Sequence, residues 1–190
     1  MKKHLTFALF TILSPCLFAN AIITNCHLQY GGHHSGEHIF DGPTLCTKGK
    51  SPGVIVRGPL NATGTVFTGN VLVDGPISVN KVTFSQLHVQ GPAYLQQTQA
   101  HTINIKGPLF AQRSQLGVIK AYSHSTRLDQ SQAKNITIIT DKSSDKRPIL
   151  KLQGKIVSFG DGTLIGHAGE VKKSTKAVIK GKVINGTIGN

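Results

Sequence analysis

The stretch VLVDGPISVNKVTFSQLHVQGPAYLQQTQAHTINIKGPLFA, residues 71–111, decides the fold because a Gly-Pro pair returns in it at a nearly constant interval. Successive pairs lie 16 or 17 residues apart, at Gly42-Pro43, Gly58-Pro59, Gly75-Pro76, Gly91-Pro92 and Gly107-Pro108. A fixed short period is typical of a stacked repeat fold in which each repeat contacts only its neighbours. The sequence therefore predicts a solenoid, and function has to be argued from sites on that scaffold.

Apolar residues alternate with polar ones on both sides of each repeat glycine. Four and two residues before the glycine lie Val54 and Val56, Val71 and Val73, Leu87 and Val89, Ile103 and Ile105. Two and four residues after it lie Leu60 and Ala62, Ile77 and Val79, Ala93 and Leu95, Leu109 and Ala111. A weaker pair follows at seven and nine residues, as Thr65 and Phe67, Val82 and Phe84, Thr98 and Ala100, Ser114 and Leu116. Since period two means a strand with one buried face, we expect an all-β, single-stranded parallel β-solenoid (β-helix) with three-sided coils of 16–17 residues.

The Gly-Pro pair is expected to form one corner of each coil. Proline fixes its own φ near about −65° and glycine accepts backbone angles that other residues avoid. The predicted corner glycines are Gly42, Gly58, Gly75, Gly91 and Gly107. The residues before them, Asp41, Arg57, Asp74, Gln90 and Lys106, place opposite charges on neighbouring rungs. Such cross-strand pairs contribute about 0.2–1 kcal/mol each, so they help to specify register more than they stabilise the fold.

The composition agrees with a narrow solenoid. The chain has 190 residues, of which 38% are hydrophobic and 15% charged, and this balance excludes a disordered tail. Tryptophan is absent and only 6% of residues are aromatic. A slender interior filled with stacked Val, Ile, Leu and Ala needs few bulky rings.

The first residues predict export. Lys2 and Lys3 form a basic start, residues 5–13 are apolar, and a small-x-small cleavage site ends at Ala21. We expect residues 1–21 to be a signal peptide and the mature protein to be periplasmic, secreted or at the cell surface. The apolar stretch is shorter than the roughly 20 residues of a transmembrane helix.

Two of the three cysteines lie beyond this signal. Cys26 and Cys46 in an oxidising compartment predict one disulfide, which would join an N-terminal cap over residues 22–41 to the first rung. Cys46 lies four residues after Gly42, in an inward slot. The loop-entropy model gives such a bridge about 3 kcal/mol. A lipoprotein cleavage before Cys16 is disfavoured by Pro15.

The chain is strongly basic. Removing Lys2 and Lys3 leaves 19 Lys and Arg against 8 Asp and Glu, a balance of about +11. Candidate polyanion-binding residues cluster late in the chain, at Lys172, Lys173, Lys176, Lys180 and Lys182. A basic exported protein is attracted to lipopolysaccharide, acidic polysaccharide, teichoic acid or nucleic acid. The competing interpretation is that the charge serves only solubility. No motif for specific nucleic-acid recognition is present.

The repeats vary along the chain. Residues 42–120 are regular, residues 121–148 are polar and predict an irregular rung or a protruding loop, and residues 149–190 predict further rungs with different corners. Short Gly-punctuated coils with an aliphatic interior, most clearly Val178–Gly189, resemble those of bactofilins, the bacterial polymer-forming β-helix proteins. This resemblance implies end-to-end self-assembly. Exported β-solenoids such as adhesin passenger segments are also similar.

One dense group of candidate metal ligands lies in the N-terminal cap. His27, His33, His34 and His38 lie near Cys26, and imidazole binds Zn, Cu or Ni. Their spacing matches no established site. We therefore expect no cofactor, and interpret the histidines as a polar cap that binds metal incidentally.

Catalytic groups are scarce. Glycoside hydrolysis normally needs two carboxylates across the scissile bond, but Asp41 and Asp74 lie on one ladder two rungs apart with Arg57 between them. A polysaccharide lyase that uses Arg113 or Arg127 as its base is the enzymatic alternative. No nucleophile elbow, metalloprotease motif or phosphate loop is present.

The outward position three residues after each repeat glycine predicts a contact surface. It is occupied by Leu45, Asn61, Ser78, Tyr94 and Phe110. Tyr94 and Phe110 should be stacked neighbours that can pack on sugar rings, nucleobases or another copy of the chain, unless the segment 121–147 buries them. The expected function is therefore that of an exported, non-catalytic structural or binding protein of the bacterial cell envelope. Its expected partners are envelope polyanions or itself, and the alternative is a carbohydrate-active enzyme.

Overall fold

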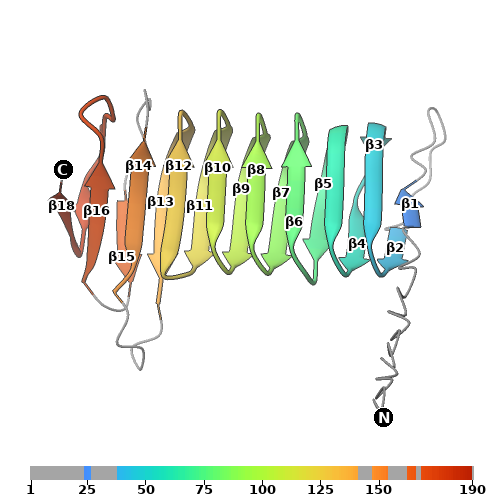
Figure 1. Cartoon of the computed structure of the whole chain (residues 1–190), viewed down its shortest axis with the longest axis horizontal. Coiled ribbons are helices and arrows are strands. Elements are labelled where there is room, and N and C mark those ends of the chain that lie inside the picture. Colours follow the sequence, from blue (N-terminus) through green and yellow to red (C-terminus); the bar gives the residue numbers. More distant parts are fainter. Residues whose placement is uncertain (1–23, 27–37, 141–146, 154–161, 166–167, 190) are drawn as a thin grey trace, which may run out of the picture.

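The computed structural model describes residues 24–26, 38–140, 147–153, 162–165 and 168–189 (Figure 1). Throughout these ranges the secondary structure is strand, without a helix, and all strands pair in parallel within one continuous sheet. The sheet winds into a β-solenoid of about eight turns. The predicted fold class is confirmed.

A regular turn consists of a four-residue strand followed by an eight-residue strand, as in β6 (Ile77–Asn80) and β7 (Thr83–Gln90). The next turn repeats this pair as β8 (Ala93–Gln96) and β9 (Gln99–Lys106). Because β8 pairs with β6 and β9 with β7, each turn lies directly on the previous one. Neighbouring turns are therefore separated by the ordinary strand spacing of about 4.8 Å.

The short strands form one side of the solenoid, called face A, which is toward the viewer in Figure 1. Face A contains β6, β8, β10 (Leu109–Gln112), β12 (Ser125–Asp129), β14 (Ile149–Gln153), β16 (Gly169–Lys173) and β18 (Gly186–Gly189), together with β1 (Thr24–Cys26) and the first halves of β3 (Thr44–Ser51) and β5 (Leu60–Val73). The first halves of the long strands β7, β9, β11 (Gln115–Tyr122) and β13 (Gln132–Ile139) form face B. Their second halves form face C, with β2 (His38–Asp41), β4 (Val54–Arg57), β15 (Gly162–Ile165) and β17 (Val183–Ile184).

Faces B and C meet at a bend inside each long strand. Phe84 and Leu87 are both buried although they are three residues apart, and so are Leu116 and Ile119. In a straight strand, residues three apart point to opposite sides. The strand must therefore turn a corner between them, which gives each coil the three sides predicted from the sequence.

The interior is a set of columns of stacked side chains. All the inward residues predicted from the period-two pattern are buried, with at most 7% of their surface exposed. Most columns are aliphatic, and Phe67 stacks on Phe84 with ring centroids 5.3 Å apart and planes at 5°. Close packing of such columns is the main stabilising contribution in a fold without a wide core.

The Gly-Pro corners are stacked so closely that they leave no room for a side chain. Gly91 has φ +153°, and a Cβ placed on it would lie 2.6 Å from the carbonyl oxygen of Gly75. The same contact recurs at Gly58, Gly75 and Gly107, each against the glycine of the preceding turn. These four rungs therefore need glycine here for two reasons, its own conformation and the backbone beneath it.

The corner between faces A and B is built differently, with a left-handed residue six positions after each repeat glycine. This row consists of Lys48, Gly64, Lys81, Gln97, Arg113 and Gln130, with φ between 47° and 63°. Buried hydroxyls complete the hydrogen bonding just inside the row. The backbone N–H of Thr98 donates to Ser114 Oγ (3.1 Å), and the N–H of Ser114 donates to Ser131 Oγ (3.0 Å). This corner is therefore held by its own ladder of side-chain hydroxyls.

Within the segment 121–148, the described residues 121–140 are more regular than the sequence suggests, whereas residues 141–146 lie outside the described ranges. The expected irregular rung or loop contains the end of β11, all of β12 and all of β13, and these strands keep the parallel register of the turns before them. Its inward slots are filled partly by small hydroxyl residues, Ser123, Thr126, Ser131 and Thr140, all of them buried. The hydropathy pattern fades here because these slots are polar, although the described strands keep their parallel pairing.

Candidate functional site

One outward ladder on face A joins aromatic and basic side chains. The strand register aligns Ser78 with Tyr94, Tyr94 with Phe110, and Phe110 with Arg127. It continues by pairing Arg127 with Lys151, and Lys151 with Lys172. The side chains from Tyr94 to Lys172 thus form a line parallel to the solenoid axis, with two rings followed by three cations. We call these five residues the face A ladder.

Tyr94 and Phe110 are neighbours, as predicted. Their ring centroids lie 6.3 Å apart with planes at 51°, and the guanidinium carbon of Arg127 lies 5.1 Å from the Phe110 ring centroid. Tyr94 is 55% exposed and Phe110 is half-buried. The expectation that the segment 121–147 could bury both rings is wrong for Tyr94, because β12 and β13 continue the solenoid. The two rings and Arg127 form a preassembled platform.

A shallow depression of about 250 Å³ lies beside the rings. Its polar lining is made of Asn61, Thr63, Ser78, Asn80, Gln96 and Gln112. Asn80 Oδ1 is buried there and has no hydrogen-bond partner among the described residues. An unmet acceptor next to exposed amides and hydroxyls suits a ligand rich in hydroxyl groups.

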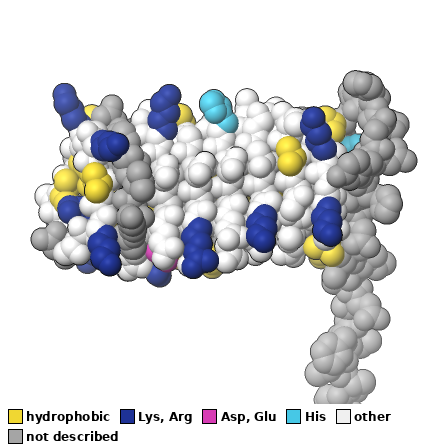
Figure 2. Space-filling model, turned by 90° about the horizontal axis from the view of Figure 1, so that it is seen from above, with side chains coloured by type: hydrophobic (Ala, Val, Ile, Leu, Met, Phe, Trp, Pro, Cys, Tyr) yellow, Lys and Arg dark blue, Asp and Glu magenta, His cyan; other side chains and the backbone are white. Residues whose placement is uncertain are grey.

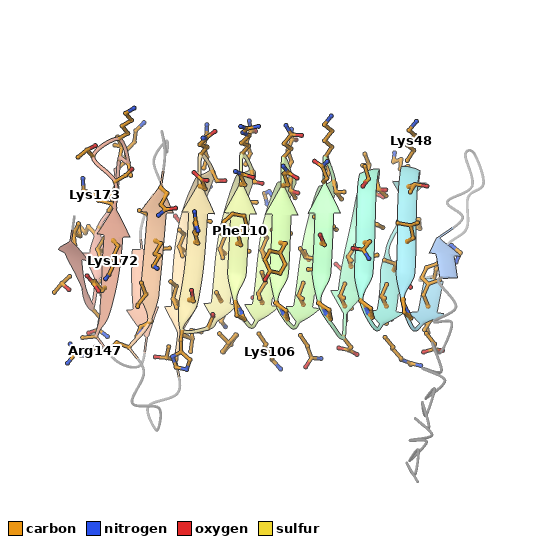
Figure 3. All side chains as sticks on the ribbon, viewed as in Figure 1. Lys48, Lys106, Phe110, Arg147, Lys172 and Lys173 are labelled. Carbon is orange, nitrogen blue, oxygen red and sulfur yellow. The ribbon has the colours of Figure 1, made fainter. Side chains whose placement is uncertain are left out.

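The basic end of the ladder lies on the later turns. Arg127, Lys151 and Lys172 are exposed, and Lys172 Nζ lies 3.3 Å from Glu170 Oε2. In Figure 3, Phe110 and Lys172 project from the same face of the sheet on β10 and β16. Each step along the ladder adds about 4.8 Å, so the distance from Tyr94 to Lys172 is about 20 Å.

The predicted C-terminal lysines come from different parts of the last turns. Lys172 and Lys173 are in β16, and only Lys172 belongs to the face A ladder. Lys176 lies in the turn after β16, and Lys180 and Lys182 come before β17, outside the strands. The sequence therefore identified the basic character of this region and one member of its aligned row.

The predicted N-terminal features are described only in part. The register sets Cys26 of β1 opposite Cys46 of β3, and Cys46 is fully buried in its predicted inward slot. His27, His33 and His34 lie outside the described residues. His38 is in β2, with its ring centroid 6.3 Å from that of Phe40. In the described ranges, no three His, Cys, Asp or Glu side chains group as metal ligands.

The candidate catalytic groups have structural partners. Arg57 Nη1 donates to Asp41 Oδ1 at 3.4 Å, and Gln90 Nε2 donates to Asp74 Oδ1 at 2.7 Å, so two neighbouring pairs of the predicted ladder are in contact. Arg113 Nε donates to Gln130 Oε1 at 3.2 Å, while Arg127 lies against Phe110. Neither arginine has a described carboxylate in an ion pair with it. Each of these four side chains therefore has a described contact with a neighbouring turn.

No protein-family model, curated protein or solved structure matches this chain. Its site must therefore be interpreted from its own geometry. Across the described ranges there is also no helix of the length and hydrophobicity needed to cross a membrane.

The sequence missed two parts of this surface. Arg127 and Lys151 were not aligned with Tyr94 because the segment 121–148 was expected to be irregular. The left-handed row at the corner between faces A and B was also missed. Five of its members lie six residues after a predicted corner glycine, but among them only Gly64 suggests a left-handed backbone, and Gln130 joins the row through the strand register.

Proposed function

We propose that this protein is an exported, non-catalytic β-solenoid of the bacterial cell envelope that binds a polyanion on face A. Export is inferred from the N-terminal sequence, and the binding role from the face A ladder. The observation that carries the proposal is the alignment of two aromatic rings and three cations on a single outward row.

The chemistry of face A favours an acidic polysaccharide among the polyanions. Aromatic rings pack on the apolar faces of sugars, and the amides beside them can exchange hydrogen bonds with sugar hydroxyls. Arg127, Lys151 and Lys172 would pair with carboxylate or phosphate groups further along the same chain. The backbone ladders fix the spacing of all five side chains, so little ordering is required on binding.

The test measures binding of polygalacturonate to the full chain and to two charge-reversal pairs. Lys151→Glu with Lys172→Glu changes face A. Lys106→Glu with Lys134→Glu changes the net charge equally at exposed sites on the long strands β9 and β13. We expect the face A pair to weaken binding about tenfold more than the control pair. This ratio corresponds to a loss of about 1.4 kcal/mol of binding free energy from the two reversed charges together. Equal losses would show attraction by net charge alone and would refute a site on face A.

The enzymatic alternative is tested in the same solutions. A polysaccharide lyase releases unsaturated product that absorbs in the ultraviolet. The absence of absorbance growth over prolonged incubation with polygalacturonate is the expected result. Growth that is lost with Arg113→Gln or Arg127→Gln would replace the binding proposal with a lyase.

A second candidate function is end-to-end self-assembly, which the resemblance to bactofilins also implies. Its support is in the last described turn, where Ile188 of β18 aligns with Val171 of β16. Val171 is 1% exposed but Ile188, in the same inward column, is 51% exposed because no described turn covers it. An uncovered aliphatic column beside the edge of β18 is a surface on which another copy can add strands.

Light scattering after size-exclusion chromatography tests this second role. We expect the unaltered protein to form assemblies that persist as the salt concentration is raised. We expect Ile188→Lys to abolish them. A monomer at every salt concentration would refute it.

The disulfide between Cys26 and Cys46 is part of the proposal for the N-terminal end, supported by their alignment in register.

A further inference from the structure

The corner between faces A and B carries a regular row of charges that the face A ladder does not use. Its residues, called the corner row, are Lys48, Gly64, Lys81, Gln97, Arg113 and Gln130. Cations alternate with neutral residues in this order along the whole row. All six residues are exposed. Figure 2 views this edge from above and shows Lys and Arg side chains at intervals along the molecule.

The strand register fixes the interval between the cations. The backbone N–H of Lys81 donates to the carbonyl of Gln96 (3.0 Å), and that of Arg113 donates to the carbonyl of Asp129 (2.9 Å). The N–H of Gln97 likewise donates to the carbonyl of Gln112 (2.9 Å), so these three members of the row are bonded to the turn that follows them. Successive cations are two rungs apart, which corresponds to about 10 Å.

The backbone conformation does not account for the cations. A left-handed residue other than glycine is uncommon, and Asn, Asp and Gly are the residues that adopt this conformation most readily. Gly64 shows that glycine is accommodated in this row, where its Cβ would meet only a side-chain carbon of Lys48 at 3.7 Å. Lys48, Lys81 and Arg113 thus occupy positions that the fold would fill more easily with other residues, and such outliers point to function.

A shallow depression of about 270 Å³ lies between two of these cations. It is bordered by Lys81 and Arg113 and is also lined by Gln97, Thr98, Gln99 and Gln115. Gln99 and Gln115 are aligned on adjacent turns. The Nε of Arg113 donates to Gln130 Oε1 at 3.2 Å, which anchors this side chain to the next turn. The depression therefore offers amides in the middle and one cation at each end.

We propose that the corner row binds an extended acidic polysaccharide that carries one carboxylate on every second sugar. One ring of a linear sugar chain advances by about one rung, so the carboxylates of alternating uronates meet Lys48, Lys81 and Arg113. The neutral sugar between two uronates lies over Gln97, with Gln99 and Gln115 as hydrogen-bond partners. This site lies on a different surface from face A and does not depend on the proposed function of that face.

The experiment compares two probes with different charge spacing. Hyaluronan has a carboxylate on every second ring, whereas polygalacturonate has one on every ring. The corner pair Lys81→Gln with Arg113→Gln removes two cations and installs the amide that the row already contains at Gln97 and Gln130. The control pair Lys106→Gln with Lys134→Gln removes two exposed cations elsewhere.

We expect the corner pair to weaken hyaluronan binding about five- to tenfold relative to the control pair, as suits two exposed charge contacts. Polygalacturonate also presents a carboxylate to every second rung, so its binding should weaken as well, but by a smaller factor because face A is proposed to carry most of it. The face A pair, Lys151→Glu with Lys172→Glu, should show the opposite preference. The two variant pairs therefore test the corner row and face A independently, so one proposal can be refuted while the other is supported.

A gain-of-function variant tests the spacing directly. Gln97→Lys places a cation on the intermediate rung, in a conformation that Lys48 and Lys81 already adopt. It should raise affinity for polygalacturonate several-fold and leave hyaluronan affinity within twofold. The proposal is overturned if the corner pair affects hyaluronan no more than the control pair, or if it weakens both probes equally.

Discussion

Substitution of a stacked corner glycine should be among the most destabilising single changes in this protein. In Gly91→Ala the new Cβ would lie 2.6 Å from the carbonyl oxygen of Gly75 and 2.7 Å from its carbonyl carbon. Both atoms belong to backbone held by ladders on each side, so the contact cannot be relieved by a side-chain rotation. Gly91 also has φ +153°, where alanine is strained.

The expected loss can be compared with that at a second glycine. Backbone strain contributes about 1–3 kcal/mol and the forced shift of packed backbone about as much again, so Gly91→Ala should cost about 3–5 kcal/mol. Gly64→Ala is the matched control, because its φ is +63° and its nearest neighbour is 3.7 Å away. There the left-handed strain of roughly 1 kcal/mol is largely offset by the reduced entropy of the unfolded chain.

Urea unfolding followed by circular dichroism measures both free energies, and thermal unfolding of Gly91→Ala should show Tm lower by roughly 10 °C. A cost for Gly91→Ala within about 1 kcal/mol of that for Gly64→Ala would refute the reasoning. It would mean that the corners can separate without disturbing the ladders, and the close stacking of glycines would then not explain their recurrence.

Three further predictions address other contacts. Ser114→Ala removes the acceptor of the buried Thr98 N–H and should lower the free energy of unfolding, measured in urea, by about 1–3 kcal/mol. The exposed control Ser78→Ala should change it by less than about 0.5 kcal/mol, and equal effects of the two variants would contradict the hydroxyl ladder. Arg57→Ala should change the free energy of unfolding by less than about 0.5 kcal/mol, since the ion pair with Asp41 is 59% and 75% exposed; a loss above 1 kcal/mol would contradict this. Peptide mapping of the oxidised protein should recover Cys26 linked to Cys46, and reduction should lower stability by about 3 kcal/mol; free thiols at both positions would exclude the bridge.

The repeat made most of the fold predictable because its inward positions are fixed by packing. A residue such as Ile103 is enclosed by the turns on both sides, so only apolar side chains suit it, and the period of two remains visible in the sequence. The period-two hydropathy pattern failed to predict strands where the inward positions do not require an apolar side chain. At Ser131 the side chain satisfies the backbone of the corner, and a small hydroxyl group serves this purpose better than an aliphatic one.

The candidate sites were less predictable because they face outward. Tyr94 and Phe110 could be aligned from the Gly-Pro period, whereas Arg127 and Lys151 follow turns of different length and could be placed only by their strand register. The corner row was hidden for another reason. Its left-handed residues are mostly Lys, Gln and Arg, which carry no conformational signature, so that Gly64 alone suggested an unusual backbone.

The hydrogen bonds that join Lys81, Gln97 and Arg113 to the next turn make the charge interval a property of the backbone. A change of interval would require whole ladders to break, whereas thermal motion of a lysine side chain moves the charge only around a fixed point. The molecule therefore presents cations at a fixed interval along its own axis. A partner whose charges repeat at a different length would come out of step after one or two contacts, and lengthening the solenoid by two rungs would add one more contact without changing any existing one.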